Sequence, residues 1–389
     1  MSVAEVAVVT WSGVSAVWWL IAIILVHATR RIQLSVELPL GMSSPSLTIF
    51  KPLPSVPDVE TRDALAACIA SFLAQLDEST ELVVGVPEEQ AGQWAPVLRE
   101  WANRYSRVQL RPVIRATPGQ RANPKVAWLE VLAPEAGGEL WLWSDADVVA
   151  PPGFLAQLRR VLALNPTAGA VTAPYGIRFT AHASGWLDAL FVNMEFLPGA
   201  LLLGRLGPVP LAFGAAVLFR AEDFRRRISW DDLGASLADD HETGRRLAPV
   251  VVSRQIAETC ALESRLGPAL RHVYRWQKTI RWCRPGGFAA LVVILPLFGW
   301  VALCTMTPGN PVPWVGLAAQ YALESGVASV LLSRVGFRGP PAGALAVLAW
   351  PALRALVWFA AWLPIPVTWG AAEAWNRPTR RPRMESHGE

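Results

Sequence analysis

Two acidic side chains, Asp145 and Asp147, are the strongest chemical feature of the sequence, and a single residue separates them. They follow the apolar stretch that begins at Trp141, which we expect to form a short buried strand. Alternation along a strand would point both carboxylates to the same side, at the edge where open α/β sheets bind ligands. Such oxygens suit a divalent cation that holds phosphate. The plainer alternative is a strand-to-loop turn, where Asp is common.

A second acidic pair, Asp239 and Asp240, lies at the start of a predicted helix over residues 240–247. Helix capping alone would explain an aspartate there. The functional alternative is that Asp240 acts as a general base and removes the proton of an acceptor hydroxyl. The pair by itself does not distinguish the two.

Alternating strands and helices must position these acids. From residue 46 onward, period-2 and helical patterns follow one another, which indicates a parallel sheet with crossover helices. The expected strands are 47–50, 81–86, 108–110, 141–149, 168–172 and 211–219, and the expected helices are 63–76, 92–105, 123–132 and 154–164. Residues 186–206 are expected to form a helix against the membrane face or in the core.

The composition excludes several classes of protein. Of 389 residues, 52% are hydrophobic and only 17% are charged, which is too apolar for an ordinary soluble enzyme. The formal net charge is only +4, and no part of the chain forms a basic domain, so we expect no nucleic-acid partner. The four cysteines lack metal-binding or disulfide spacing. The sequence does not indicate an oligomeric state.

Apolar segments near both ends predict membrane spans. Residues 6–28 are uncharged and long enough to cross a bilayer, and Arg30 and Arg31 follow, which places the next domain in the cytoplasm. A basic, tryptophan-bearing segment, 269–287, is typical of an interfacial amphipathic helix.

The C-terminal region 288–366 predicts two to three spans, with segments 288–306, 314–332 and 343–362 as candidates. Two of them carry buried charges, Glu324 and Arg354, which we expect to pair. Four spans in all would put the basic tail 367–389 outside, while its charge favours the inside. This conflict stays open at the sequence level, because residues 350–366 also fit a re-entrant or interfacial piece.

The ordered set of motifs resembles one family. The chain is similar to membrane glycosyltransferases of the GT-A fold, in the ceramide glucosyltransferase-like branch, which includes a hopanoid-associated bacterial member. Each motif is short, but the order is specific. The residues that carry the resemblance are Phe50-Lys51-Pro52-Leu53, Asn123-Pro124-Lys125-Val126, Ser144-Asp145-Ala146-Asp147, Phe213-Gly214-Ala215, Leu237-Ala238-Asp239-Asp240, His272-Val273-Tyr274-Arg275-Trp276 and Arg284-Pro285-Gly286-Gly287-Phe288.

The resemblance implies a nucleotide-sugar donor, a UDP-sugar, and a lipid hydroxyl as acceptor. It implies an α/β GT-A (nucleotide-diphospho-sugar transferase) domain over residues 46–268, with a mostly parallel sheet, joined to helical transmembrane segments in a bacterial-type inner membrane. Asp147 and Asp145 would hold Mg²⁺ or Mn²⁺ on the diphosphate, and Asp240 would be the base. The donor-binding residues it implies are Lys51, Pro52, Glu88, Lys125, Asp145, His272, Arg275 and Trp276.

Two positions depart from the family pattern. Glu88 stands where the family carries a nucleoside-binding Asp after the second strand, and His272 opens the closing motif where the family has Gln or Arg. A second frame of that motif, 278–282, also fits loosely. The leading hypothesis is an inverting, integral-membrane glycosyltransferase that acts on ceramide-, hopanoid- or glycerolipid-like acceptors. The alternatives are a processive polysaccharide synthase and a catalytically decayed membrane scaffold.

Overall fold

The chain forms two compact units. The computed structural model describes residues 1–30, 45–106, 108–116, 118, 121–368, 374–375 and 377–379. The helical unit comprises Met1–Ile32, Gly176–Leu202 and Ala261–Thr368, and the sheet unit comprises Gln33–Tyr175, Leu203–Cys260 and Trp369–Glu389. Residues 176–202, part of the predicted 46–268 domain, thus group with the C-terminal helices. The predicted basic flank at Arg31 and most of the basic tail lie outside the described residues.

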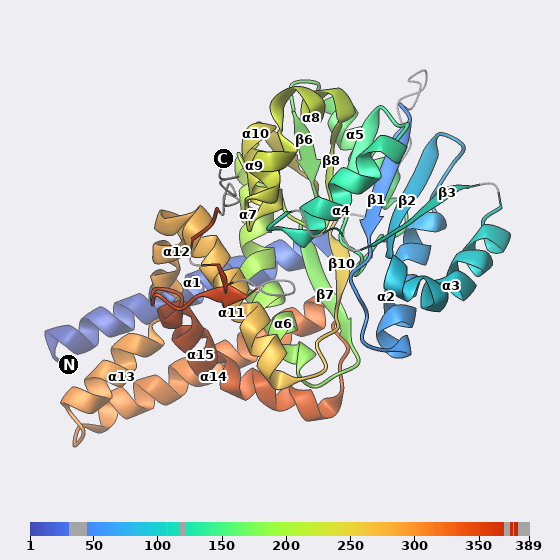
Figure 1. Cartoon of the computed structure of the whole chain (residues 1–389). Coiled ribbons are helices and arrows are strands. Elements are labelled where there is room, and N and C mark those ends of the chain that lie inside the picture. Colours follow the sequence, from blue (N-terminus) through green and yellow to red (C-terminus); the bar gives the residue numbers. More distant parts are fainter. Residues whose placement is uncertain are drawn as a thin grey trace, which may run out of the picture. The chain divides into compact units, whose positions relative to one another are not determined.

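A seven-stranded sheet organises the sheet unit, in the order β3-β2-β1-β4-β8-β6-β9 (Figure 1). Its strands are β1 Leu47–Pro52, β2 Thr80–Pro87, β3 Gln109–Arg115, β4 Leu140–Trp143, β6 Ala170–Thr172, β8 Val217–Arg220 and β9 Val250–Val252. The strand pairs β1–β2, β1–β4, β2–β3 and β6–β9 are parallel, and β8 is antiparallel to both β4 and β6. The sheet is therefore mostly parallel, as predicted.

Burial explains the strand order. Every residue of β1 and β2 is buried, as expected for central strands of a parallel sheet covered on both faces. β3 is mostly exposed and contains Arg111, Pro112 and Arg115. Charged residues and a proline are typical of an edge strand, because they discourage pairing with another chain.

Helices connect the strands and end at recognisable caps. They are α2 Val59–Leu73, α3 Ala91–Arg104, α4 Pro124–Leu132, α5 Phe154–Leu164, α8 Ala221–Arg227, α9 Trp230–Gly234 and α10 Asp239–Arg246. Asp58 caps α2 by accepting a hydrogen bond from the Thr61 N–H at 2.7 Å. Asn123 caps α4 in the same way through the Val126 N–H at 3.2 Å. The predicted helix 154–164 is confirmed at both ends.

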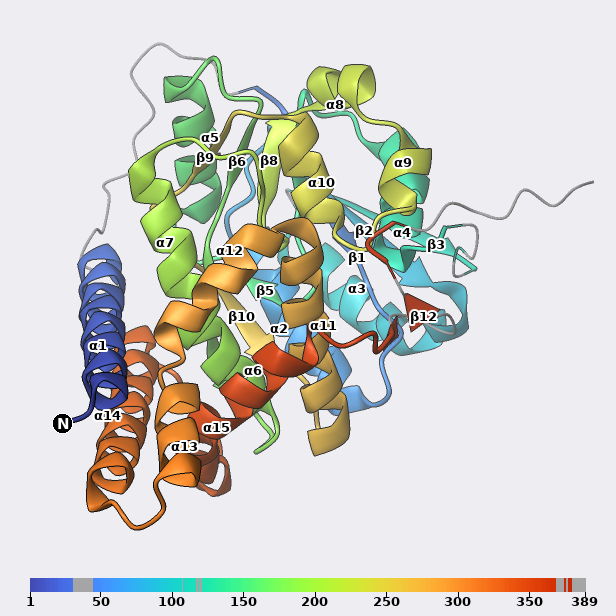
Figure 2. The same cartoon turned by 90° about the vertical axis from the view of Figure 1, so that its left-hand side faces the viewer.

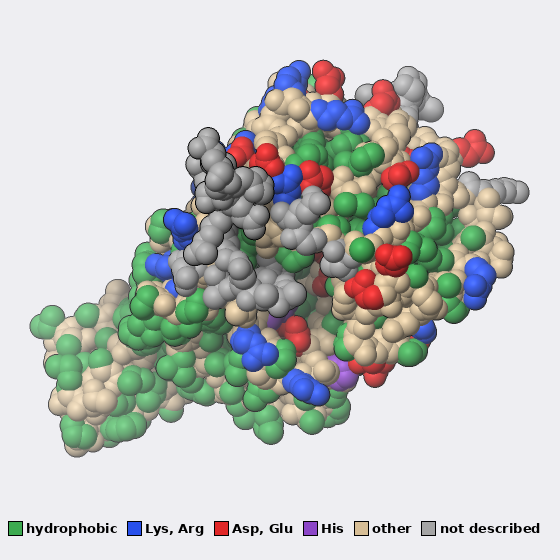
Figure 3. Space-filling model, viewed as in Figure 1, with side chains coloured by type: hydrophobic (Ala, Val, Ile, Leu, Met, Phe, Trp, Pro, Cys, Tyr) green, Lys and Arg blue, Asp and Glu red, His purple; other side chains and the backbone are tan. Residues whose placement is uncertain are grey.

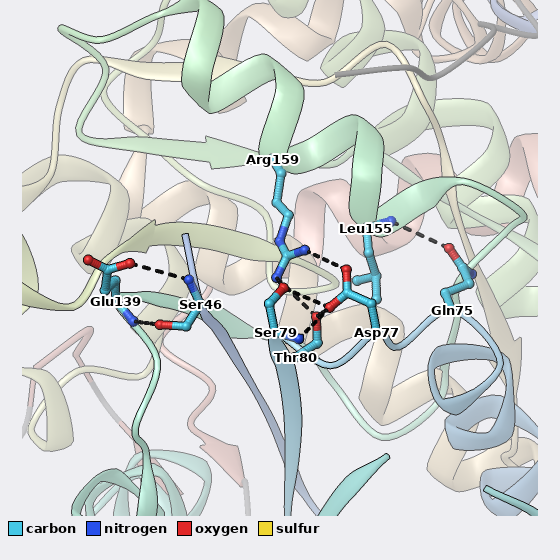
Figure 4. Close-up of polar contacts among 8 residues, drawn as sticks. All are labelled: Ser46, Gln75, Asp77, Ser79, Thr80, Glu139, Leu155 and Arg159. Atoms are coloured by element: carbon cyan, nitrogen blue, oxygen red, sulfur yellow. Dashed lines mark hydrogen bonds and ion pairs between the residues drawn. The ribbon is translucent and has the colours of Figure 1, made fainter. Parts of the chain in front are cut away.

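Polar side chains fasten α5 to the segment that leads into β2 (Figure 4). The guanidinium of Arg159 lies 3.2 Å from an Asp77 carboxylate oxygen and donates to the Thr80 hydroxyl at 3.0 Å. Gln75 accepts from the Leu155 N–H at 3.5 Å. These contacts fix α5 near the amino end of β2, so the carboxyl ends of the strands stay free for a site.

The predicted strand 211–219 is wrong in its first half. Strand β8 begins only at Val217, and Gly214 lies in a turn. The Thr172 side chain gives the physical reason, because its hydroxyl accepts from the Phe213 N–H at 2.8 Å and donates to the Ala216 carbonyl at 3.0 Å. A side chain thereby takes hydrogen bonds that a strand would give to its neighbour.

The helical unit packs long apolar helices beside one another. In Figure 2, α1 lies beside α14, and α13 also packs against α14. The unit's helices are α1 Val3–Arg30, α6 Gly185–Phe191, α7 Leu197–Leu206, α11 Leu266–Cys283, α12 Pro285–Ala290, α13 Leu297–Met306, α14 Pro311–Val335 and α15 Leu345–Ala360. A π-helical turn, Val192–Phe196, joins α6 to α7.

Four helices of the described residues are long and apolar enough to cross a membrane. They are Val3–Thr29, Gly185–Leu206, Pro311–Val335 and Pro341–Ala360. Hydrophobic side chains gather over α13 and α14 in Figure 3. Exposed hydrophobic residues of these two helices include Val301, Val315 and Val330. The segment predicted as one span at 288–306 is broken instead, because Pro285–Ile294 and Leu297–Met306 meet at 59°.

A buried ion pair stabilises this break. Arg354 pairs with Glu324 at 2.8 Å, which confirms the pairing expected from the sequence. The same guanidinium donates to the Ile294 carbonyl at 2.5 Å, just before the bend. A backbone carbonyl freed by a helix break needs such a partner in an apolar environment.

Candidate active site

The two sequence-predicted acids lie in a turn, not on a strand. β4 ends at Trp143, and the Val148 N–H donates to the Asp145 carbonyl at 3.3 Å before β5, Val148–Val149, begins. Strand alternation therefore does not orient Asp145 and Asp147. A turn does so instead, with both side chains half-buried and Ala146 buried between them. We call this segment, Ser144–Asp147, the aspartate turn.

Lys51 holds the aspartate turn in place through hydrogen bonds. Its side chain is fully buried at the end of β1 and donates to the Ser144 hydroxyl at 2.9 Å and the Asp145 carbonyl at 2.7 Å. Its ammonium also lies 3.7 Å from the centre of the Phe72 ring. Burial lowers the pKa of Lys51 to about 7, although Cys68 and Asp145 oppose the shift. Lys51 thus positions the turn, and its direct contact with a donor stays a prediction.

Lys125 joins the aspartate turn to the second acidic pair. Its ammonium lies 2.6 Å from an Asp145 carboxylate oxygen and 3.1 Å from one of Asp239. Burial lowers the pKa of Lys125, but the two carboxylates outweigh it and raise the pKa above its usual value. The ammonium is therefore charged at any physiological pH, and it holds two negative side chains from distant parts of the chain together.

Asn123 explains why Lys125 reaches both acids. It is fully buried, and besides capping α4 it donates to the Ser236 carbonyl at 3.0 Å and to Asp239 at 3.3 Å. The start of α4 is thereby fixed against the start of α10. Because Lys125 stands in the first turn of α4 and Asp239 in the first turn of α10, the cap also sets the distance between them.

Gly214 brings Asp145 and Asp240 to one place. A Cβ at Gly214 would lie 3.3 Å from an Asp145 carboxylate oxygen and 3.4 Å from one of Asp240. The two acids therefore face the same small space, which only a hydrogen atom lines on that side. Burial, and then the charge of Asp239, raises the pKa of Asp240 to about 7, while Lys125 opposes the shift.

Tyr175 faces the same acids and was missed from the sequence. Burial first, and then the charges of Asp240, Asp145 and Asp147, raises the pKa of Tyr175 above its usual value. Asp147 and Asp240, 93 positions apart in the chain, thus act on the same hydroxyl. No local signal marks Tyr175, whereas Asp239 could have been chosen because it neighbours Asp240.

The segments after β1 and β2 are also fixed to each other. Pro52 is buried at the end of β1, and the following Leu53 N–H donates to the Gly85 carbonyl at 2.9 Å. Gln90 forms two hydrogen bonds with the Val56 backbone, at 3.0 and 2.9 Å. Glu88 opens the short helix after β2 and is exposed. Its contact with the nucleoside stays a prediction.

The remaining predicted residues belong to the helical unit. On α11, the His272 ring lies 4.2 Å from the Trp276 ring and its Nδ1 lies 3.3 Å from Asp188. Trp276 also packs on Phe191 of α6, with ring centres 5.3 Å apart. Arg275 is half-buried on the same helix.

Comparison with known proteins decides the family. The family model described as glycosyl transferase family 21 matches residues 11–373, nearly the whole chain. The chain belongs to glycosyl transferase family 21. The mostly parallel sheet is accordingly its GT-A domain, and the protein is a nucleotide-sugar-dependent glycosyltransferase. No curated protein matches the chain.

Solved structures resemble the family 21 transferase at low identity. A mannosyltransferase from Pyrobaculum calidifontis, in complex with GDP-Man and Mn²⁺, is 16% identical, with 92% of this chain and 97% of that chain covered and a TM-score of 0.48. S. aureus TarS 1–349 with UDP-GlcNAc is 10% identical, covering 85% and 99% at a TM-score of 0.38. GalNAc-T7 with UDP, GalNAc and Mn²⁺ is 11% identical, covering 62% and 51% at 0.40. The family assignment rests on the family match alone.

The aspartate turn of the family 21 transferase fits a divalent cation. Among the residues that the structure describes, no group of three or more His, Cys, Asp or Glu side chains is placed to hold a metal by itself. Mg²⁺ characteristically uses only one or two carboxylates and takes other oxygens from substrate phosphates. Asp145, whose side chain is 39% exposed, and the half-buried Asp147 match that pattern.

Proposed function

We propose that this family 21 transferase moves one sugar from a UDP-sugar to a lipid hydroxyl at the membrane, with inversion at the sugar carbon. The observation that carries the proposal is the shared space at Gly214, which Asp145 and Asp240 both face. One acid stands where a metal diphosphate would bind, and the other is half-buried with a raised pKa. A donor site and a base therefore lie side by side, as a single displacement requires.

Asp240 would act as the base. With a pKa of about 7, a substantial fraction of Asp240 is ionised near neutral pH, and the ionised form is basic enough to accept a proton from a hydroxyl. As the acceptor oxygen forms a bond to the anomeric carbon, that proton would pass to Asp240, and the bond from the anomeric carbon to the diphosphate oxygen would break. Attack from the face opposite the diphosphate inverts the configuration.

Asp147 and Asp145 would hold Mg²⁺ or Mn²⁺, which neutralises charge on the departing diphosphate when bound. Lys125 would keep Asp145 in place and add positive charge nearby. Lys51 and Pro52 would shape the floor of the donor site, and Glu88 would meet the nucleoside. Each of these chain residues orients the donor toward Asp240.

Arg275 and Trp276 would close over the diphosphate, with His272 as the first residue of the closing motif. Guanidinium groups make strong charge-assisted hydrogen bonds to phosphate. The second frame fits this role less well, because Lys278 donates to the Leu363 carbonyl and Arg281 lies over the Trp362 ring at 5.4 Å. Its cations already serve packing within the helical unit.

The apolar helices support the proposal of a lipid acceptor. Val3–Thr29 has a mean hydropathy of 2.0 and is only 28% buried, so its side chains need another apolar environment. A membrane provides that environment and also the hydroxyl-bearing lipid. We place the catalytic domain on the cytoplasmic side of a bacterial inner membrane, because Arg30 and Arg31 follow the first helix.

Transfer of radiolabelled sugar to lipid tests the proposal. Purified protein in lipid vesicles, with Mn²⁺ or Mg²⁺ and a panel of nucleotide sugars, should label an organic-phase product from ceramide, hopanoid or glycerolipid acceptors, and a chelator should abolish the labelling. If none of the acceptors in the panel becomes labelled, the lipid proposal is refuted.

Two further measurements separate the alternatives. A ladder of products on a gel would indicate a processive synthase. Absence of nucleoside diphosphate binding in a calorimetric titration with Mn²⁺ would indicate a decayed scaffold, which the retained Asp145, Asp147 and Asp240 oppose.

A further inference from the structure

Helix α15, together with the short helix Pro341–Ala344 before it, is long and apolar enough to span a membrane. The helical stretch Pro341–Ala360 has 20 residues and a mean hydropathy of 1.6, and about 20 residues suffice to cross a bilayer. Its outer face is apolar and exposed. The exposed apolar side chains of this helix and the segment after it include Leu345, Leu348, Leu356, Phe359, Trp362 and Ile365. Whether it crosses depends on where its two ends are held.

The beginning of this stretch is held close to the sheet unit along the chain. The Arg338 N–H donates to the Arg178 carbonyl at 2.8 Å, and the Thr180 N–H donates to the Arg338 carbonyl at 3.1 Å. Arg178 comes three residues after Tyr175, where the chain leaves the sheet unit. Three extended residues reach about 10 Å. Residue 338 is therefore on the catalytic side of the membrane.

The end of the stretch is held to α11. Tyr274 donates from its hydroxyl to the Ile365 carbonyl at 2.8 Å, and Lys278 donates to the Leu363 carbonyl. Helix α11 begins at Leu266, soon after the chain leaves the sheet unit at Cys260. It carries Arg271, Arg275, Lys278 and Arg281. Such a basic helix belongs at the membrane surface on the catalytic side and not in the hydrocarbon.

The residues after α15 return to the sheet unit. There the Leu237 N–H donates to the Pro378 carbonyl at 2.9 Å, and Thr379 pairs with Ser236 as an antiparallel bridge. The chain between Thr368 and Ala374 can reach about 20 Å, less than the roughly 30 Å of the hydrocarbon layer. The connection from Thr368 to Ala374 is therefore too short to cross the membrane.

Contacts within the helical unit identify the helices that do cross. Asn310, before α14, donates to Glu5 at 2.7 Å, and at the other end Arg334 lies 2.9 Å from His27. Helix α14 therefore runs beside α1 in the same direction. The bent pair α12–α13 returns the chain to the N-terminal side before α14 begins. The candidate Gly185–Leu206 makes no single crossing, because the chain leaves the sheet unit after Tyr175 and re-enters it at Leu203. Three crossings, by α1, the bent pair and α14, leave residue 335 on the catalytic side.

We propose that α15 and its following segment, residues 345–365, lie in the leaflet on the catalytic side and do not cross the membrane. Their partner is the acyl-chain layer of that leaflet, which covers the exposed apolar face. The opposite face packs inward through Trp350 and Arg354. The proposal rests on the membrane association proposed above, and it places the basic tail on the catalytic side, which removes the conflict between span count and charge.

Cysteine labelling in sealed cells tests this topology. In a cysteine-free variant of the full chain that retains transfer activity, Ala342→Cys and Thr368→Cys flank the segment 345–365 at exposed positions. Gly309→Cys marks the loop before α14, where a Cβ meets nothing within 4 Å. Glu222→Cys, exposed on α8, marks the catalytic domain. A membrane-impermeant maleimide should label only Gly309→Cys in intact cells, and the other three only after the cytoplasm is opened.

Labelling of Ala342→Cys and Thr368→Cys from opposite sides would overturn the proposal. A green fluorescent protein fused after Glu389 of the unaltered chain provides a second measurement, because it fluoresces in the cytoplasm and not after Sec export. We expect fluorescence, and an active alkaline phosphatase fusion at the same point would contradict the topology. Recovery of the chain in the soluble fraction would instead refute membrane association, so the two failures are distinguishable.

Discussion

At the scale of single residues, the proposed role of Asp240 in proton transfer depends on the side chains around it. Burial and the neighbouring Asp239 make its ionised form costly, and Lys125 partly compensates. A surface aspartate would be too weak a base to accept a proton from an alcohol near neutral pH. Asp239, Lys125 and Asp240 itself thus set both the geometry and the basicity of the proposed site.

We expect Asp240→Asn to lower kcat for sugar transfer by about 10²–10⁴-fold, because the amide keeps the shape but cannot accept the proton. The KM for the donor should change little. Asp232→Asn is the matched control, since Asp232 is an exposed acid on the neighbouring helix that pairs with Arg246. Steady-state kinetics of both variants would measure kcat and the KM for the donor. Full activity in Asp240→Asn would exclude Asp240 as the base.

The pH profile should report the same group. A base acts only when ionised, so a raised pKa delays activity to higher pH. With the pKa of Asp240 at about 7, kcat/KM should rise as pH increases through about 7 and level off above it. A rising limb near the pKa of an ordinary aspartate would show that Asp240 is not the titrating base.

Lys125→Met should destabilise the sheet unit and weaken donor binding. The change leaves Asp145 and Asp239 without their shared counter-ion, and an uncompensated buried charge costs about 3 kcal/mol or more. Most of the cost should come from Asp239, whose side chain is 9% exposed. Adding Asp239→Asn should restore part of the stability in thermal unfolding. No recovery in the double variant would mean that the pairing does not matter.

At the scale of elements, the turn around Gly214 matters because of what it leaves empty. The sequence predicted a strand there, but the structure has a turn that places Gly214, which has no side chain, beside the two carboxylates. Thr172 instead binds the backbone on both sides of Gly214 and holds the turn. The turn that replaces the predicted strand thus leaves the space between the proposed donor site and the proposed base.

Gly214→Ala should lower donor affinity and transfer without unfolding the protein. The added methyl group would lie 3.3–3.4 Å from the Asp145 and Asp240 carboxylates and narrow the shared space. Gly92→Ala is the control, because a Cβ there meets nothing within 4 Å. Nucleotide titration and circular dichroism would separate binding from folding. Equal nucleotide affinity in both variants would show that the space does not receive the donor.

At the scale of the whole molecule, the proposed place of the enzyme at a lipid surface rests on the apolar helices of the helical unit. Val17 lies near the middle of α1 and is 58% exposed. Val17→Arg should reduce the fraction of protein that resists alkaline extraction from membranes, because an arginine at a helix centre costs about 2.5–3.5 kcal/mol on insertion. Val17→Leu should leave the fraction unchanged. If both variants behave alike, α1 is not exposed to lipid.

The sequence alone determined what local patterns and ordered motifs can carry. Alternating periodicity predicted the parallel sheet and the helix 154–164, because one periodic face is enough to define an element. The motif order, from Lys51 to Trp276, indicated the glycosyltransferase family before any coordinates. The apolar runs indicated membrane helices, although the bend after Ile294 has no counterpart in hydropathy.

Only the tertiary structure decided which distant residues meet. Asn123 and Lys125 fix the start of α10 against the aspartate turn, and Tyr175 joins the acids without any signal of its own. The two ends of the α15 region are held by hydrogen bonds to Arg178 and Tyr274, which are far away in the chain. The physical reason is that propensity and periodicity act over a few residues, whereas a buried charge or an unpaired carbonyl is satisfied by whichever partner the fold brings near.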